Sequence, residues 1–180
     1  MANLKVSVTS EDHIQGSEDA AVTLVEYGDY QCPHCGVAYS IVKQVQDRYG
    51  DDLRFVFRNF PLAEIHPHAE SAAEAAEFAG ANGSFWEMHD GIYENQQRLS
   101  TKLLLELTSG IGLSVDDLRE ALASHEFAPR VKKDFLGGVR SGVNGTPTFF
   151  INGVRHDGAY DFKTLTDAID SQLLQLRAAG

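Results

Sequence analysis

The chain has 180 residues, 43% of them apolar, which fits one compact domain or a domain with an insertion. Its 15 basic and 26 acidic residues give a formal net charge of −11. This charge argues against a nucleic-acid partner, which needs basic contacts to phosphate, and against binding to an anionic membrane. No stretch approaches the ~20 apolar residues of a transmembrane helix, so we expect no membrane segment in this chain.

The first twenty residues, MANLKVSVTSEDHIQGSEDA, contain no apolar run as long as that of a secretory signal. A cytoplasmic location is therefore the default expectation. A mature periplasmic or cell-envelope domain whose leader has been removed, with Met1 in its place, would read the same way. Both locations are kept as expectations.

The first half of the chain predicts two strands joined by a helix. An apolar run at 21–27 indicates a buried strand, and residues 53–60 alternate in the manner of a second strand. Between them a helix is expected from Pro33, a residue that suits the first helical turn, to Gly50. This order is typical of a β-α-β unit with parallel strands. The apolar residues of 4–8 also fit a short strand.

The second half is mostly helical and ends with a hairpin and a helix. Four helical patterns fall within 63–125, which we expect to form an insertion, and another helix is expected over 128–139. The Asn152-Gly153 pair inside TPTFFINGVRHDG predicts a β-hairpin. Asp161 is expected to cap the last helix. The chain as a whole predicts an α/β fold, with a mixed sheet flanked by helices.

The only two cysteines, Cys32 and Cys35, enclose Pro33 and His34. If a helix begins at Pro33, the two sulfurs lie within reach of disulfide geometry. Cys32 then faces the unpaired N–H groups of the helix N-terminus, which favour the thiolate and lower its pKa. His34 adds a dipole or partial positive charge beside the sulfur. Because both effects stabilise the reduced form, the pair would be an oxidising redox couple.

Three other interpretations explain the cysteine pair less well. A zinc site usually has a second close pair of ligands, and the nearest histidines, His66 and His68, fit a turn or a helix start more simply. A structural disulfide across so short a loop would constrain the unfolded chain little. Inert buried thiols do not explain a pair at a helix start that follows a strand. A catalytic redox pair is favoured, and no metal is expected.

Two further features have two interpretations each. Glu26 lies inside the apolar run and is either a strand-end residue that reaches solvent or a half-buried carboxyl group that relays protons to the cysteines. The Thr146–Pro147 bond precedes the apolar strand TFFI, and only about 5% of X–Pro bonds are cis. The local sequence does not decide either question.

The segments EYGDYQCPHC, FRNFPL and GVNGTPTFFING together resemble the thioredoxin superfamily and, within it, the DsbA-like thiol-disulfide oxidoreductases. The resemblance runs from residue 20 to residue 169. Within the family, the chain is similar to the domain appended to some sodium/proton antiporters. It implies a thioredoxin fold built from residues 1–62 and 126–180, with an inserted helical domain at 63–125. No cofactor is expected.

The resemblance also implies roles for single residues. Cys32 would be the exposed nucleophile and Cys35 the resolving cysteine, while Pro33 and His34 would set the redox poise. Glu26 matches the buried acidic position of the family, which favours the proton-relay interpretation.

Far downstream, Pro147 would be a cis-proline packed against the active disulfide. The backbone of Thr146 would then pair with an extended substrate segment, as in strand addition.

We therefore expect a protein-disulfide oxidoreductase that acts on protein thiols and disulfides through a mixed disulfide at Cys32. A redox partner protein or glutathione would recycle it. A glutathione-linked transferase or isomerase is an alternative, although the intact cysteine pair counts against it, and a non-enzymatic redox-sensing interaction domain is another. The direction of exchange stays open, because well-known oxidising members carry an export signal and none is visible here.

Overall fold

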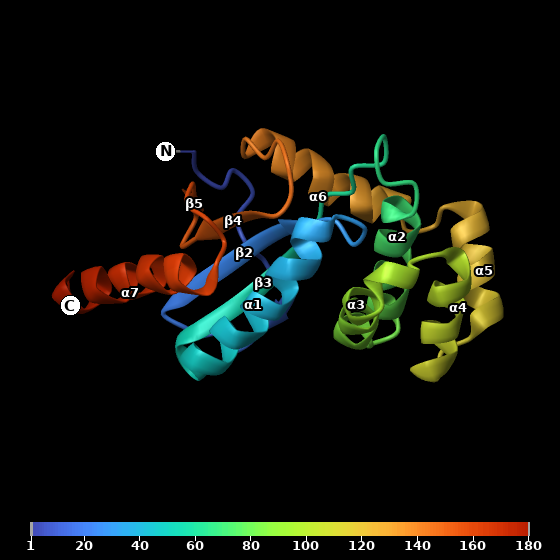
Figure 1. The fold of residues 1–180 in the computed structure, drawn as a ribbon, viewed down its shortest axis with the longest axis horizontal. Helices are drawn as coiled ribbons and strands as arrows, with labels where there is room; N and C mark the ends of the chain where they lie inside the picture. The colour runs from blue at the N-terminus through green and yellow to red at the C-terminus, as the bar shows by residue number, and fades with distance from the viewer. Residues whose placement is uncertain (1, 180) are drawn as a thin grey trace.

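The computed structural model describes residues 2–179, which contain a five-stranded mixed sheet (Figure 1). The strands are β1 (His13–Gln15), β2 (Val22–Gly28), β3 (Leu53–Asn59), β4 (Thr148–Ile151) and β5 (Val154–His156). Their order across the sheet is β1-β3-β2-β4-β5. The β2–β3 pair is parallel, and the other pairs are antiparallel. The predicted β-α-β unit and hairpin are confirmed.

Helices occupy both faces of the sheet and one end of the molecule. They are α1 (Pro33–Tyr49), α2 (Ala69–Ala81), α3 (Phe85–Glu94), α4 (Thr101–Gly110), α5 (Val115–Ser124), α6 (Ala128–Arg140) and α7 (Phe162–Ala179). Two 3₁₀ turns, η1 (Gly50–Asp52) and η2 (Gln96–Arg98), complete the set in the described residues. Helices α2 to α5 gather beside the sheet, and α6 runs from them to the sheet (Figure 1). These four helices fall inside the predicted insertion, whose status as a separate domain stays a prediction.

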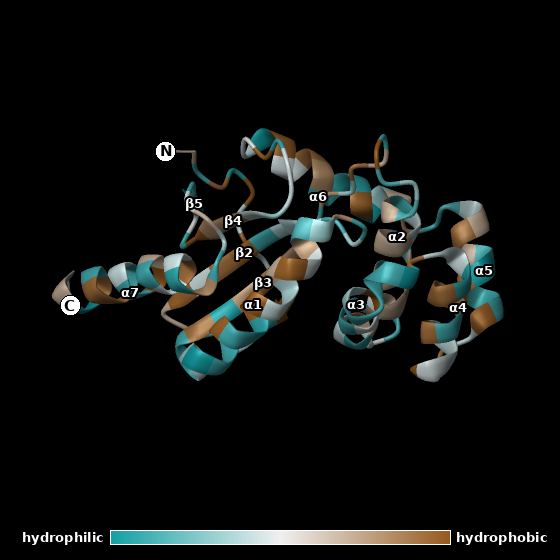
Figure 2. Cartoon of the chain, in the orientation of Figure 1, coloured by the Kyte–Doolittle hydropathy of each residue, from teal (hydrophilic) through white to brown (hydrophobic). Residues whose placement is uncertain are grey.

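The sheet buries apolar side chains on both faces, because side chains alternate along each strand. Figure 2 shows apolar residues concentrated on β2 and β3 and on one side of α1. The face that packs against α1 and α7 buries Val22, Leu24, Phe55, Phe57, Phe149 and Ile151. The opposite face buries Val25, Tyr27, Val56 and Phe150. Since Glu26 lies between Val25 and Tyr27, its side chain points to the α1 face, toward the cysteines.

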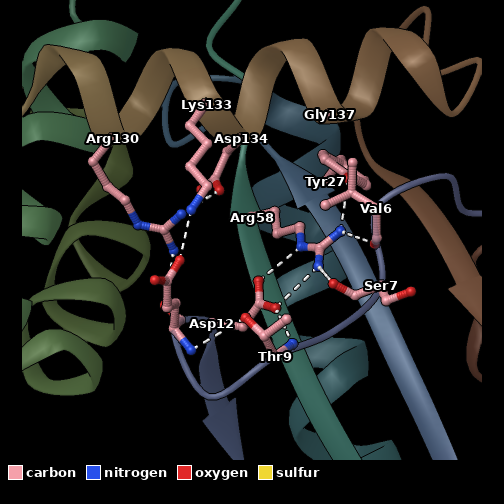
Figure 3. A pocket seen from close by; sticks show the side chains of 11 residues that line it. Val6, Ser7, Thr9, Asp12, Tyr27, Arg58, Arg130, Lys133, Asp134 and Gly137 are labelled. Carbon is pink, nitrogen blue, oxygen red and sulfur yellow. Dashed lines mark hydrogen bonds and ion pairs between the residues drawn. The ribbon is translucent and has the colours of Figure 1, made fainter.

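The expectation of a strand over residues 4–8 is wrong. The buried guanidinium of Arg58 donates to the carbonyl oxygens of Val6 and Ser7, at 2.8 and 3.0 Å, so a side chain takes up backbone groups that a strand would pair (Figure 3). Asp12 holds the same guanidinium through two contacts, at 2.8 and 3.0 Å. This segment packs over the sheet, and the edge strand β1 forms directly after it.

Local signals explain where α1 begins and ends and where α7 begins. Pro33 occupies the first turn of α1, and α1 ends at Gly50, whose φ of 49° favours glycine. Asp161 accepts the backbone N–H of Thr164 at 3.0 Å, which confirms it as the cap of α7. The start of α1 sets the position of the cysteine pair.

Candidate active site

Cys32 is the N-cap residue of α1, as predicted, with an extended backbone (φ −67°, ψ 121°). Cys32 is only 5% exposed, so the expectation of an exposed cysteine is wrong, because the turn before β4 packs against its sulfur; Cys35, one turn later, is fully buried. Both thiols are free. An attacking group therefore reaches the sulfur of Cys32 first, and Cys35 lies behind it.

The two thiols have opposite acidities. A hydrogen bond from the Cys35 thiol, together with Thr146 and the backbone N–H groups of Cys35 and His34, outweighs burial and lowers the pKa of Cys32 to about 5. Burial, and the hydrogen bond to Cys32, raise the pKa of Cys35 well above its ordinary value. At neutral pH the reduced site holds one thiolate and one thiol, which is the arrangement of a nucleophile and its resolving partner.

Glu26 is buried, and its Oε1 atom has no hydrogen-bond partner among the described residues. Burial, and to a smaller extent the negative charge of Cys32, raise the pKa of Glu26 to about 8. The same carboxyl group contributes to the raised pKa of Cys35. The strand-end interpretation is therefore wrong, because the side chain does not reach solvent. A carboxyl group whose pKa lies near neutrality, and whose charge acts on a buried thiol, meets the electrostatic condition of the proton-relay interpretation.

The segment before β4 meets the cysteine pair from the other side. The Cys32 sulfur lies 3.5 Å from the carbonyl oxygen of Thr146. The Thr146–Pro147 peptide bond is cis. Thr148 Oγ1 donates to the carbonyl oxygen of Gly145 at 2.7 Å and closes the turn. The backbone of Thr146 thus forms one wall of the site.

His34 is exposed and turns away toward the loop before α7. Its Nδ1 atom lies 2.8 Å from the hydroxyl of Tyr160. The contribution of His34 to the lowered pKa of Cys32 is made by its backbone N–H. A polar cavity of about 170 Å³ opens next to Tyr160, lined by Pro147, Arg155 and His156 among others. This cavity adjoins the site on the Pro147 side.

Asp29 organises the turn between β2 and α1, and the sequence interpretation missed it. Its Oδ1 atom accepts the backbone N–H groups of Gln31 and Cys32, at 2.8 and 3.2 Å. Its Oδ2 atom accepts the N–H of Leu62 at 2.9 Å and contacts His66 Nδ1 at 2.7 Å. An acidic residue three positions before a predicted N-cap was the signal in the sequence, since such residues often bind turn N–H groups.

Gln96 was also missed. It belongs to η2, and its amide donates to the carbonyl oxygens of Tyr30 and Cys32, each at 2.9 Å. No local pattern could indicate this, because the contact joins residues 64 positions apart.

The metal alternative gains no support from His66, which pairs with Asp29. Within residues 2–179, no three His, Cys, Asp or Glu side chains come together so as to hold a metal ion. Over the same residues, no helix combines the length and apolar character needed to cross a bilayer.

The family model described as Thioredoxin matches residues 8–171, which is most of the chain and includes the cysteine pair and the Thr146–Pro147 turn. The chain belongs to this thioredoxin family. Its five-stranded mixed sheet with flanking helices is the thioredoxin fold expected from the sequence.

Among solved structures, this thioredoxin-family chain is similar to BdbD from Bacillus subtilis, with 27% identity and a TM-score of 0.86 over 96% of this chain and 98% of that one. It is also similar to alpha-DsbA1 from Wolbachia pipientis, with 18% identity and a TM-score of 0.82 over 98% and 100% of the two chains. The second likeness is one of fold. Both alignments extend over nearly the whole chain, so the helical block is shared as well as the sheet.

A curated relative is the protein named Na(+)/H(+) antiporter NhaA 1 of Salinispora arenicola, which is 44% identical over 160 residues. That alignment covers 89% of this chain and 24% of the relative. The chain therefore spans about a quarter of the length of such relatives, consistent with the resemblance to an antiporter-associated domain.

Proposed function

We propose that the chain is a thiol-disulfide oxidoreductase that exchanges disulfides with protein substrates through a mixed disulfide at Cys32. The observation that carries this proposal is the pairing of a low-pKa cysteine at a helix N-terminus with a buried, high-pKa cysteine one turn later. The first is suited to attack or be attacked, and the second to resolve the intermediate.

In the oxidising direction, the site begins with a Cys32–Cys35 disulfide. A substrate thiolate attacks Cys32 Sγ, the S–S bond breaks, and Cys35 leaves as a thiolate that takes a proton from Glu26. A second substrate thiolate then attacks the substrate sulfur of the mixed disulfide and releases Cys32 as a thiolate. The substrate loses two electrons and the cysteine pair gains them. A disulfide-bearing partner protein or glutathione disulfide would reverse this change on the enzyme.

The wall formed by Thr146 supports a binding mode for the substrate. Its carbonyl oxygen is at 3.5 Å from the reacting sulfur, so a backbone N–H of an extended substrate next to its cysteine would find an acceptor there. Pro147 contributes no N–H and leaves the carbonyl side of this turn as the pairing edge. The site would thus recognise the substrate through backbone hydrogen bonds more than through its side chains.

The lowered pKa of Cys32 supports oxidation as the favoured direction. Stabilising the thiolate stabilises the reduced pair and makes the disulfide a stronger oxidant. Such a couple suits the oxidising cell envelope better than the cytosol, where thiols are kept reduced. We expect a reduction potential more positive than about −200 mV, against ~−270 mV for thioredoxin.

Refolding of reduced hirudin and reduction of insulin test the function. Cys32→Ser should abolish activity in both assays, and Cys35→Ser should accumulate mixed disulfides that mass spectrometry detects. Equilibration with glutathione buffers gives the reduction potential. Full activity of Cys32→Ser would refute the proposal, and a potential near that of thioredoxin would refute its direction.

A further inference from the structure

Gln96 reaches from the helical block to the active-site turn. It follows α3 directly, in η2, and its Nε2 group donates to the carbonyl oxygens of Tyr30 and Cys32. These carbonyls stand on either side of Gln31. One amide group therefore spans the turn that leads into α1 and satisfies a carbonyl of Tyr30 that precedes the helix.

The Cys32 carbonyl is held from two directions. It accepts the Gly36 N–H at 3.1 Å, the first hydrogen bond of α1, and the Gln96 amide at 2.9 Å. Two donors on one carbonyl fix the orientation of the peptide that begins the helix. The backbone N–H groups that follow, those of His34 and Cys35, also act on the Cys32 sulfur, after the larger effects of the Cys35 thiol and Thr146.

Gly36 leaves the space that Gln96 fills. A Cβ atom at position 36 would overlap the Gln96 carboxamide, with Oε1 and Cδ as the nearest atoms. Glycine is unfavourable inside a helix compared with alanine. The glycine is thus explained by the amide that packs on it, and not by the needs of α1.

Contacts between α1 and α3 fix the position of Gln96 relative to the active-site turn. The rings of Tyr39 and Tyr93 stack with centroids 5.2 Å apart, and Lys43 pairs with Asp90 at 2.9 Å. These contacts join the thioredoxin part of the chain to the helical block close to the cysteine pair. Gln96, three residues after Tyr93, therefore follows a segment that is packed against α1.

We propose that Gln96 is a positioning residue for thiol-disulfide exchange: it fixes the turn before Cys32 so that the N–H groups of the first turn of α1 face the reacting sulfur. This inference rests on the proposed function. By this inference the helical block contributes Gln96 to the active site.

The primary test is Gln96→Met, which keeps the length of the side chain and removes both hydrogen bonds. We expect the pKa of Cys32, followed by thiolate absorbance at 240 nm, to rise by about one pH unit. At pH 5, near the pKa of wild-type Cys32, such a rise slows alkylation by iodoacetamide about fivefold. Gln97→Met, at the neighbouring exposed position, is the matched control and should leave the pKa unchanged.

Gly36→Ala provides a second variant that breaks the same contact from the other side. The new methyl group displaces the Gln96 amide, the flexible end of a side chain, while alanine favours the helix. We expect a raised Cys32 pKa without a loss of thermal stability. With Gln96→Ala as a further single variant, the double variant Gly36→Ala/Gln96→Ala should shift the pKa no further than the larger of its two single changes, because both remove one interaction.

The outcomes separate this inference from the proposed function. If wild-type protein exchanges disulfides and the Gln96→Met and Gly36→Ala variants both match Gln97→Met in pKa and alkylation rate, the positioning role is refuted. If the Cys32 pKa rises in both variants while wild-type protein shows no exchange, the positioning role stands and the proposed function fails. A variant that shifts the melting temperature but not the pKa also counts against the inference, because it shows a structural role alone.

Discussion

Asp29 Oδ2 and His66 Nδ1 lie 2.7 Å apart behind the active-site turn, and the other oxygen of Asp29 accepts the N–H of Cys32. Asp29 is 1% exposed, so its carboxylate depends on these donors in place of water. One buried carboxyl group thus ties the cysteine turn to the segment after β3.

Asp29→Ala should lower the free energy of unfolding by about 3 kcal/mol, because three backbone N–H groups lose a buried acceptor. Asp29→Asn should cost less, since its one carbonyl oxygen can still accept from the Cys32 turn. Urea unfolding of the reduced proteins measures both effects. Glu64→Ala, an exposed neighbour, should stay within about 0.5 kcal/mol of wild type. Equal stability of all four proteins would contradict the role of Asp29.

The acidity of Cys32 gives a prediction for reactivity. Its pKa of about 5, due first to the hydrogen bond from Cys35, means that alkylation by iodoacetamide should rise with pH around 5 and level off above about pH 6.5. Cys35 should not react in the folded protein at neutral pH, since burial raises its pKa. Peptide mapping after alkylation distinguishes the two sites. Removing the donor with Cys35→Ala should move the Cys32 inflection upward, and an inflection near the ordinary thiol pKa of ~8.5 in wild type would contradict this account.

What could be predicted from sequence were the features encoded locally. Pro33 marks the start of α1, and the apolar runs on either side mark β2 and β3, so the position of the cysteine pair followed from short stretches. The edge strand β1 was not predicted, because its three residues are only half-buried and show no alternation. Residues 4–8 do alternate, but their apolar side chains pack on the sheet while Arg58 takes their carbonyl groups.

The site itself depends on contacts that no local pattern shows. Glu26 could be suspected from its place inside an apolar run, yet its burial depends on the packing of α1 against the sheet. The Cys32–Thr146 contact joins residues 114 positions apart, and only the resemblance to a known family placed Thr146 and Pro147 at the site. Gln96 had neither a local signal nor a place in that resemblance. Tertiary packing, and not propensity, brings these groups to the two sulfurs.

The Cys32 thiolate should make the stability of the reduced protein depend on pH. The folded-state pKa of Cys32 is lowered to about 5, so the thiolate contributes stability that is fully present above the unfolded-state pKa, near 9, and is lost as the pH falls through 5. At pH 7 this amounts to roughly 3 kcal/mol, at about 1.4 kcal/mol per pH unit. Reduced wild-type protein should therefore exceed Cys32→Ser in unfolding free energy at pH 8, and the difference should vanish near pH 4. A constant difference across this range would exclude a lowered pKa.

Glu26 should make stability depend on pH in the opposite direction to Cys32. Burial raises its pKa from 4.5 to about 8, so the protonated carboxyl group contributes stability below pH 4.5 that is lost as the pH rises through 8. Replacing it by glutamine removes this dependence. Glu26→Gln should be about 3 kcal/mol more stable than wild type at pH 7 and nearly equal to it at pH 4.

The same variant tests whether Glu26 delivers the proton that Cys35 takes when it leaves. A carboxamide in place of the carboxyl group has no acidic proton to give, so the pH–rate profile of disulfide exchange should lose its inflection near pH 8 and the rate at neutral pH should fall about tenfold or more. Stopped-flow reaction of the oxidised protein with a thiol peptide measures the profile. Because the variant is expected to be more stable, a slower rate is not explained by unfolding. A gain in stability with an unchanged rate profile would show that Glu26 is a buried carboxyl group without a role in proton transfer.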